Sequence, residues 1–240
     1  MVFYLIGLGL NERGISLHGK KILKNCSKIY LENYTVEFPY TKKELEKQLK
    51  IKTIDAGREF VESEKIIDEA ENKDIALLVY GSPLSATTHI SLINKAIKNK
   101  IKYKIMHAGS IFDAVAESGL QIYKFGKTTS LPKFTKSFTP TSFIEIIKDN
   151  QKINAHTLLL IDIGLSFENA KQQLQQTKSS LFSSEKIIVC SRLEIKSRFY
   201  YDKLENINAE KIKAPYCIII PGKLNHDEEE NLKNITTRIN

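Results

Sequence analysis

Short apolar runs that lead into glycine-containing loops are the feature that most limits how this 240-residue chain can fold. Two such runs, at 2–6 and 75–79, lead into the loops GLGL at 7–10 and YGSPL at 80–84, and a further strand expected at 101–106 leads into HAGS at 107–110. An apolar run of this length that ends at a glycine loop is typical of a buried parallel strand. The pattern therefore favours an α/β fold over an all-helical one.

Helical patterns separate these strands in the first half of the chain. They cover 15–25, 41–50, 60–72 and 85–100, a further helix starts at Ile111, and another short strand is expected at 28–31. Thr41 is followed three residues later by Glu44, the spacing of a capping box at a helix start. Strands that alternate with helices predict a mainly parallel sheet with helical crossovers.

The pattern changes in the second half. Residues 118–140 combine scattered aromatics, glycines and prolines without a helical period. Beyond them we expect helices at 142–150, 166–176 and from 225, strands at 156–162, 186–191 and 216–220, and an extended segment at 192–200. We accordingly predict two α/β domains, residues 1–112 and 113–240.

The charged residues and cysteines indicate which partners and which cellular compartment to expect. Lys and Arg total 36 against 28 Asp and Glu, but only five of these cations are arginine. Because nucleic-acid readers favour the planar guanidinium, we interpret the +8 charge as a lysine-rich surface that attracts an acidic or nucleic-acid-bound partner, and we expect no direct nucleic-acid role. The chain shows no membrane-length apolar run and no secretory leader, and its three cysteines are far apart, so we expect a cytoplasmic protein without a membrane anchor.

Glycine loops at strand ends indicate a nucleotide-like or adenosyl ligand, because glycine lets a ligand approach the backbone. The dinucleotide fingerprint is absent, since the glycine after Gly7 and Gly9 is Gly14. No phosphate-binding P-loop, paired metal ligands or nucleophile elbow is found, and we predict no metal. His89 and His107 lie near the loops and are candidates to line a cleft. A reaction that needs few side chains, such as transfer of a preactivated group, fits best.

Several segments together resemble the diphthine synthase family of S-adenosylmethionine-dependent methyltransferases, which has the tetrapyrrole methylase fold. They are FYLIGLGLNERGISLHG (3–19), VYGSPLSATTH (79–89), HAGSIFDAV (107–115), GLQIYKFGKTTS (119–130), PTSF (140–143), HTLLLIDI (156–163) and PGKL (221–224). The resemblance implies two α/β domains with the cofactor in the cleft between them, in a homodimer. It also implies methylation, to the trimethylated amine, of a 3-amino-3-carboxypropyl adduct on a histidine of translation elongation factor 2.

Motif position in this family implies contacts with S-adenosyl-L-methionine, and with its product S-adenosyl-L-homocysteine. The residues concerned are Leu10, Ser82, Ser85, Ser110, Ile111, Ile161, Leu193 and Asn225. Two of them depart from the family pattern, because Ser82 replaces an aspartate and Asn225 replaces a histidine. Serine keeps a hydrogen-bonding group but loses a charge that would favour a sulfonium. No general base is assigned, since bulk water can accept the proton of an amine that titrates near pH 8.

Two alternatives stay open from the sequence. A methylase of the same fold that acts on a tetrapyrrole carbon would need a wider, more apolar substrate cavity. A non-enzymatic basic module would bind RNA with strong salt dependence and without a cofactor. Titration with S-adenosylhomocysteine separates the enzymes from the module, because only the enzymes need to bind it.

Overall fold

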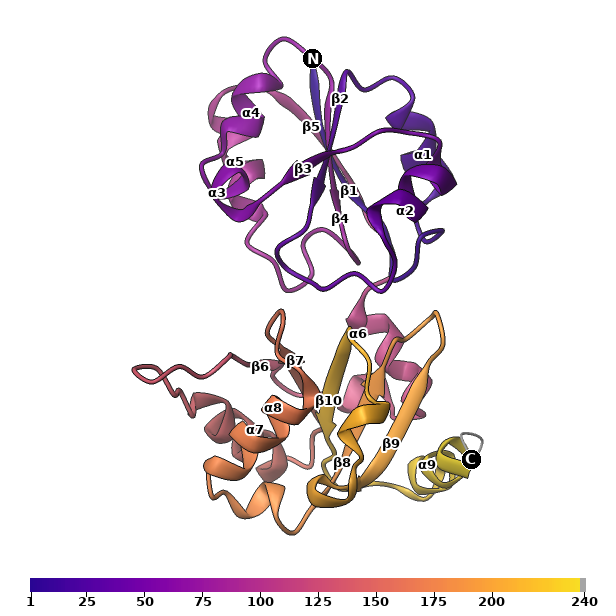
Figure 1. Ribbon diagram of the computed structural model, residues 1–240, viewed down its shortest axis with the longest axis vertical. Coiled ribbons are helices and arrows are strands. Elements are labelled where there is room, and N and C mark those ends of the chain that lie inside the picture. The colour runs from indigo at the N-terminus through magenta and orange to yellow at the C-terminus, as the bar shows by residue number, and fades with distance from the viewer. Residues whose placement is uncertain (238–240) are drawn as a thin grey trace. The chain divides into compact units, whose positions relative to one another are not determined.

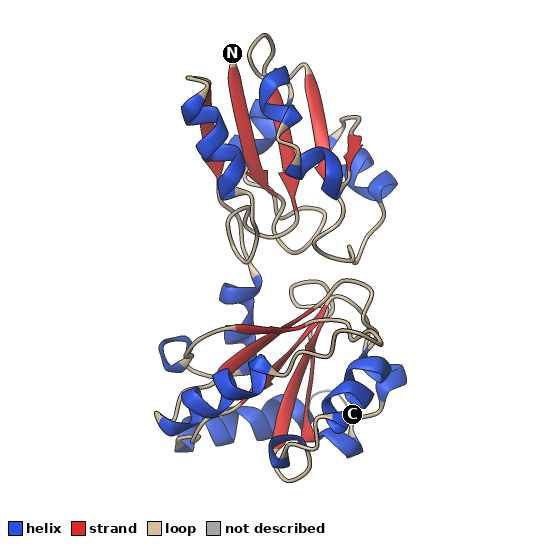
Figure 2. Cartoon of the chain, turned by 90° about the vertical axis from the view of Figure 1, so that its left-hand side faces the viewer, coloured by secondary structure: helices blue, strands red, loops and turns tan. Residues whose placement is uncertain are grey.

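The computed structural model describes residues 1–237 and divides the chain into two compact units, Met1–Phe112 and a second unit that begins at Asp113. Each unit is built on its own five-stranded sheet with helices packed against it (Figures 1 and 2). The chain is thus an α/β protein with two sheets. Within the described residues, no helix is both long enough and apolar enough to cross a membrane.

The first unit contains a fully parallel sheet with strand order β3-β2-β4-β1-β5. Its strands are β1 (Val2–Gly7), β2 (Lys28–Glu32), β3 (Ile54–Ala56), β4 (Ile75–Val79) and β5 (Lys102–Met106). Helices α1 (Leu17–Leu23) and α2 (Lys42–Leu49) lie on one side of it, and α3 (Arg58–Glu62), α4 (Lys65–Glu69) and α5 (Ile90–Lys98) on the other (Figure 1). The predicted parallel sheet is confirmed.

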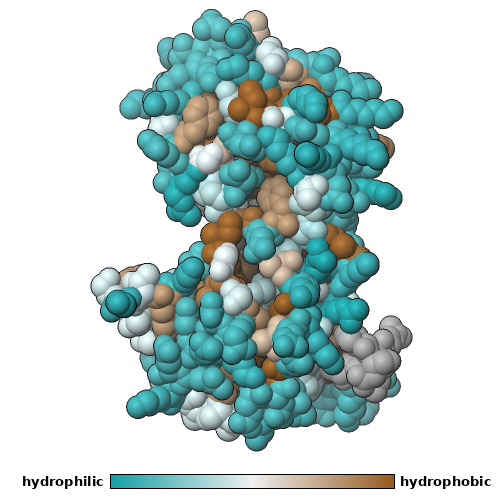
Figure 3. All heavy atoms as spheres, in the orientation of Figure 1, coloured by the Kyte–Doolittle hydropathy of each residue, from teal (hydrophilic) through white to brown (hydrophobic). Residues whose placement is uncertain are grey.

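The position of β4 in the centre of this sheet follows from its composition. All five residues of the strand, IALLV, are buried, because helices cover both faces of a parallel sheet. Leu5 of β1 and Ile66 and Ile67 of α4 join the same core. The polar surface lies outside these layers, and the face in Figure 3 is mainly hydrophilic.

Some details of the first unit differ from the prediction. The expected helix over 60–72 is wrong, because Glu64 adopts a left-handed conformation (φ 60°) that ends α3 and starts α4. The helix expected from residue 85 begins only at Ile90. Strand β3 was not expected, since a three-residue strand with two exposed positions carries almost no periodic signal. The capping box of Thr41 and Glu44 is present as predicted.

The second unit contains a mixed sheet with strand order β6-β7-β10-β8-β9. Its strands are β6 (Thr129–Leu131), β7 (Thr157–Ile161), β8 (Lys186–Ser191), β9 (Arg198–Lys203) and β10 (Tyr216–Ile220). Only the β6–β7 pair is parallel, and the other three pairs are antiparallel. The α-helices are α6 (Ile111–Ala114), which straddles the boundary, α7 (Ser142–Lys152), α8 (Phe167–Gln176) and α9 (His226–Thr237).

Short 3₁₀ turns complete the second unit at Val115–Ser118 (η1), Ile122–Lys124 (η2), Ser180–Phe182 (η3), Leu204–Asn206 (η4) and Ala209–Lys211 (η5). The strands expected near 156–162, 186–191 and 216–220 are confirmed. The extended segment expected over 192–200 is partly wrong, because left-handed Arg192 and Glu194 form a turn and β9 begins at Arg198. Strand β6 was not expected.

Candidate active site

Three glycine-containing loops meet at one edge of the first sheet, the edge formed by the carboxyl ends of its parallel strands. Strands β4, β1 and β5 are parallel neighbours, so the loops after them, 80–85, 7–10 and 107–111, emerge at the same edge. Gly9 and Gly81 join the first two loops directly: the amide of Gly81 donates to the Gly9 carbonyl (2.9 Å) and the amide of Gly9 to the Gly81 carbonyl (3.2 Å). In parallel α/β sheets this edge is where ligands bind.

Gly7 is the point at which the three loops touch. A Cβ added there would lie 2.6 Å from the carbonyl oxygen of Gly81 and 3.0 Å from both Ala108 and Pro83. Contacts that close do not occur around real side chains, so the close approach of the loops requires glycine. The glycine that ends the first apolar run is therefore needed for packing between loops.

Side chains reinforce the contact between loops. The Tyr80 hydroxyl donates to the carbonyl of Leu10 (2.9 Å), which connects the second loop to the first. Ser82 is buried, and its Oγ lies 3.2 Å from Nδ1 of His107, which connects the second loop to the third. That His107 lines a cleft stays a prediction.

His89 supports the second loop from beneath. Its ring is almost fully buried, and Nδ1 lies 3.1 Å from the carbonyl oxygen of Pro83. A carbonyl only accepts, so Nδ1 carries the proton in this contact. Thr87 Oγ1 donates to the same carbonyl (2.7 Å). Two donors on one oxygen hold the turn that carries Ser82 and Ser85.

The third loop leaves space beside its backbone. A Cβ added at Gly109 would meet no atom within 4 Å, and one at Gly81 would meet only the Gly109 carbonyl, at 3.9 Å. Around this space the structure gathers the predicted residues of the first unit. Buried Leu10, Ser82 and Ser110 and half-buried Ser85 and Ile111 all lie on the three loops. The edge thus offers open backbone, an apolar wall and buried hydroxyl groups.

The strand register of the second unit separates its three predicted residues. Ile161 ends β7 and Leu193 follows β8, and both lie at the edge where β10 begins, because Tyr216 pairs with Ser191 and Ile218 with Leu159. Asn225 follows the other end of β10, where Ile220 pairs with Thr157. The two edges are at opposite ends of β7, which are about 13 Å apart because a strand rises roughly 3.3 Å for each residue. The structure brings Ile161 and Leu193 to one edge and leaves Asn225 at the other.

Asn225 instead begins helix α9. Its Oδ1 accepts from the backbone amide of Glu228 (2.9 Å), while Glu228 Oε2 accepts from the backbone amide of Asn225 (3.0 Å). This reciprocal pair is a capping box, with asparagine as one of the favoured first residues. The exposed side chain also donates from Nδ2 to Gln121 Oε1 (3.2 Å).

Glu228 is the centre of a buried ionic cluster that the sequence did not indicate. Its carboxylate accepts from Lys124 Nζ (2.5 Å), and Oε1 lies 3.0 Å from His156 Nε2. The amide of Gly222 donates to His156 Nδ1 (2.9 Å), so the neutral ring carries its proton on Nε2 and donates it to Glu228. The three side chains come from η2, α9 and the residue before β7. Their separation in sequence is the reason that no motif predicted them.

The environment shifts both titrating groups of this cluster. Burial alone would raise the pKa of Glu228, but its hydrogen bonds from Lys124, from two backbone amides and from His156 lower that pKa to about 2. Burial lowers the pKa of His156 by more than the contact with Glu228 raises it. Glu228 is therefore an anion and His156 a neutral donor near pH 7. The cluster stabilises the fold at the edge away from Ile161.

The chain is similar to known proteins in both sequence and fold. A family model described as tetrapyrrole (corrin/porphyrin) methylases matches residues 2–196. Diphthine methyl ester synthase of Schizosaccharomyces pombe is 40% identical, over 95% of this chain and 80% of that protein. Diphthine synthase of Methanococcus maripaludis is 37% identical, over 98% of this chain and 99% of that protein. A crystal structure of diphthine synthase superposes with a TM-score of 0.89 at 26% identity, covering 99% and 96% of the two chains.

Proposed function

Because the chain belongs to the diphthine synthases within the tetrapyrrole methylase family, we propose that it methylates the 3-amino-3-carboxypropyl adduct on a histidine of translation elongation factor 2. Membership makes it an S-adenosylmethionine-dependent methyltransferase of diphthamide biosynthesis. The observation that supports the proposal is the junction of three loops around Gly7, beside which the backbone at Gly81 and Gly109 is open.

The residues at this edge fit S-adenosylmethionine. The space beside Gly81 and Gly109 admits a flat group against the backbone, and buried Leu10 supplies an apolar surface. Ser82 and Ser110 provide buried hydroxyl groups. We propose that Leu10, Ser82, Ser85, Ser110 and Ile111 hold the cofactor. The family usually has a negatively charged aspartate at the position of Ser82. The serine has no charge and forms a hydrogen bond with His107.

The part of the protein in the reaction is to position groups and to exclude water. When bound, S-adenosylmethionine supplies a methyl group already activated on a sulfonium, so no protein nucleophile is needed. The hydrogen bonds from Tyr80 to Leu10 and from His89 to Pro83 fix the loops that orient the ligand. The accepting amine must lose its proton first, and an α-amino group that titrates near pH 8 does so into water.

The number of methyl groups is the finer part of the proposal. We expect three on the amine, as the resemblance to the diphthine synthase family implies. A second candidate adds an ester on the adduct's carboxylate, and the 40% identity with a diphthine methyl ester synthase favours testing it. Mass spectrometry of the modified peptide counts the methyl groups. Mild alkaline hydrolysis then removes an ester methyl and leaves the N-methyl groups in place.

The decisive test is transfer of label from methyl-labelled S-adenosylmethionine to elongation factor 2 that carries the adduct. Elongation factor 2 without the adduct is the control. Absence of transfer in conditions that support an established diphthine synthase would overturn the proposal. Calorimetric titration with S-adenosylhomocysteine separates an enzyme from a basic RNA-binding module, and incubation with a porphyrinoid tests the tetrapyrrole alternative. We further propose a homodimer in the cytoplasm, which sedimentation velocity and fractionation would check.

A further inference from the structure

A basic groove runs along the free edge of the second sheet. It has a volume of about 650 Å³ and is lined by β9, by the segment that connects β9 to β10, and by the end of β8 with the turn after it. Five consecutive residues, Arg198–Asp202, line it. Because side chains alternate between the two faces of a strand, a hollow lined by five residues in a row reaches the backbone of the strand. Strand β9 is the last in the sheet order, with β8 on its other side.

The backbone of this edge is available for pairing. Beyond the ladder with β8, no backbone hydrogen bond joins Phe199–Asp202 to another part of the described chain. In an antiparallel pair, alternate residues of the outer strand direct their N–H and C=O groups outward. Helix α9 contacts β9 on the side of Tyr201, whose hydroxyl is near Glu229. The side with Arg198 and Tyr200 faces the connecting segment.

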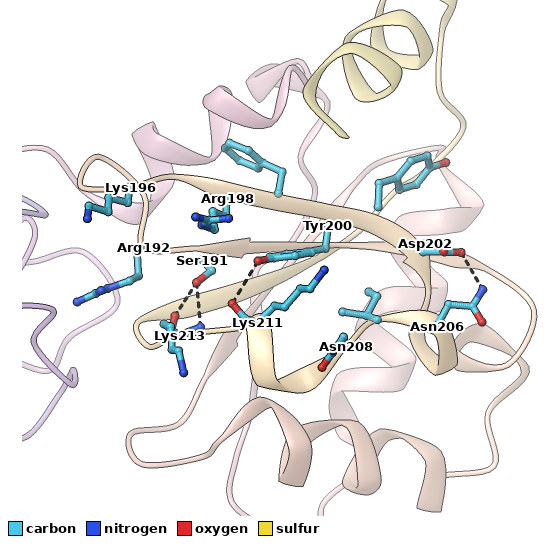
Figure 4. A pocket seen from close by; sticks show the side chains of 13 residues that line it. Ser191, Arg192, Lys196, Arg198, Tyr200, Asp202, Asn206, Asn208, Lys211 and Lys213 are labelled. Atoms are coloured by element: carbon cyan, nitrogen blue, oxygen red, sulfur yellow. Dashed lines mark hydrogen bonds between the residues drawn. The ribbon is translucent and has the colours of Figure 1, made fainter. Parts of the chain in front are cut away.

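Cations outnumber anions in the groove, with five basic side chains against the one carboxylate of Asp202. Lys196, Arg198, Lys211 and Lys213 are exposed, and none of the four forms an ion pair with a described residue. Figure 4 shows Lys196, Arg198, Arg192 and Lys213 at one end, and Asp202 at the other. Asp202 accepts from Asn206 Nδ2 (3.1 Å) and from the Lys203 amide (2.7 Å), so this carboxylate already has hydrogen-bond donors. The groove is therefore complementary to an anion.

We propose that this groove binds an extended acidic segment of the protein substrate, which adds a strand to β9. An edge strand with unpaired donors and acceptors matches a peptide backbone, and the flanking cations match its carboxylates. The inference rests on the proposed function for the identity of the substrate. It adds a docking site on the second unit, built from residues other than those of the loops after β1, β4 and β5.

Two other occupants fit less well. The Tyr200 hydroxyl donates to the carbonyl of Lys211 (3.2 Å), and its ring packs against the core, so the ring is not free to stack on a nucleic-acid base. A second copy paired through β9 would bring two basic grooves together, and lysines on an edge strand oppose such pairing. A peptide of opposite charge meets neither obstacle.

The first test measures binding of a peptide to the full chain. The probe is a fluorescent octapeptide of alternating glutamate and valine, followed by anisotropy. A second peptide has prolines in place of its two central valines and so lacks N–H groups there. We expect salt-sensitive binding of the first peptide and much weaker binding of the second. Equal binding of both peptides would refute strand addition, and tighter binding of an oligouridine would refute the choice of a protein partner.

Charge reversal locates the site. Arg198→Glu with Lys211→Glu should weaken binding of the octapeptide about tenfold, since two favourable pairs become unfavourable. The control is Lys47→Glu with Lys98→Glu, two exposed lysines of the first unit, which gives the same net charge. An equal loss in the control would attribute the binding to overall charge. If neither peptide binds the unmodified chain, the docking site is refuted, and the cations serve only to protect the edge strand from pairing.

Methyl transfer to elongation factor 2 completes the test and separates the two proposals. The groove variant should raise KM for the factor about tenfold, without changing the affinity for S-adenosylhomocysteine. If the unmodified chain transfers no methyl group but binds the octapeptide through Arg198 and Lys211, the proposed function fails and the groove stands. If transfer by the groove variant is normal and the peptide does not bind, the docking site fails and the function stands.

Discussion

Replacement of Glu228 with glutamine is expected to destabilise the second unit by removing one carboxylate oxygen from a fully occupied site. Oε2 accepts from Lys124 Nζ and from the Asn225 amide, and Oε1 accepts from His156 Nε2 and the Gln121 amide. In either orientation, the NH₂ group of glutamine would face two donors. The Lys124 ammonium would also lose its counter-charge.

The magnitude follows from the pKa of the carboxyl group. Its folded value of about 2 lies below the ordinary 4.5 because Lys124 and the amides stabilise the anion against the cost of burial. At 1.36 kcal/mol for each pKa unit, the anionic form contributes about 3 kcal/mol to stability. Breaking a buried ion pair by removing one partner costs about 3–5 kcal/mol in other proteins, in the same range. We therefore expect the glutamine variant to lose about 3 kcal/mol near neutral pH.

The pH dependence gives the same prediction a second, independent signature. A folded pKa below the unfolded value means that the stabilisation is complete above pH 4.5 and is lost as the pH falls toward 2. His156 acts in the same direction at higher pH, because its lowered pKa makes protonation below pH 6.5 favour the unfolded chain. The glutamine variant lacks the first contribution, so its stability curve should be flatter than that of the unmodified chain in the acid range.

Urea denaturation followed by circular dichroism, repeated from neutral to acid pH, measures both effects. The matched control is Glu145→Gln, which removes an exposed carboxylate that pairs with Lys148 on the surface of α7 and should leave stability nearly unchanged. The reasoning is refuted if Glu228→Gln loses less than about 1 kcal/mol, a third of the worked value. Parallel acid curves for the variant and the unmodified chain would refute it as well.

Three further variants test the first unit. Gly7→Ala places a Cβ 2.6 Å from the Gly81 carbonyl and should cost about 1–3 kcal/mol of stability in denaturation experiments; an unchanged midpoint would contradict the tight junction of loops. Gly109→Ala meets nothing within 4 Å, so it should fold normally but bind S-adenosylhomocysteine more weakly by calorimetry, and unchanged affinity would place the ligand elsewhere. Thr41→Ala removes the capping contact with Glu44 and should cost about 1 kcal/mol, whereas no change in denaturation midpoint would show that the cap contributes little.

The parallel sheet of the first unit could be predicted because its inner strands β1, β2 and β4 are mostly buried, whereas the outer strand β5 is largely exposed. Strands such as Ile75–Val79 are then apolar at every position, and the helices between them have their own period. In the second unit, the apolar pattern of the sequence does not indicate whether neighbouring strands are parallel or antiparallel. The apolar run of β10 is as continuous as that of β4, yet it pairs antiparallel with both neighbours. Direction there depends on the connection through residues 204–215, which has no regular pattern.

The candidate site divides in the same way. Its loops were predictable, because glycines after apolar runs are visible in the sequence and parallel strands bring them together. The contacts between loops were not predictable, since Tyr80 to Leu10 and Ser82 to His107 join residues far apart in the chain. The ionic cluster is the extreme case, with Lys124 and Glu228 at positions 104 residues apart. Such contacts depend on the folded geometry of several elements at once.

Asn225 is the residue at which motif position and structure point in different directions, and one substitution distinguishes them. The capping box with Glu228 explains this asparagine without a ligand, and β10 separates it from the edge with Ile161 and Leu193. Asn225→His should therefore cost about 1 kcal/mol of stability, because histidine caps a helix poorly, and should leave the affinity for S-adenosylhomocysteine unchanged. Asn225→Ser is the control, since serine keeps the cap. If the histidine variant binds S-adenosylhomocysteine more tightly than the serine variant does, residue 225 contacts the ligand. The prediction that Asn225 lies too far from the edge with Ile161 and Leu193 to bind it would then be wrong.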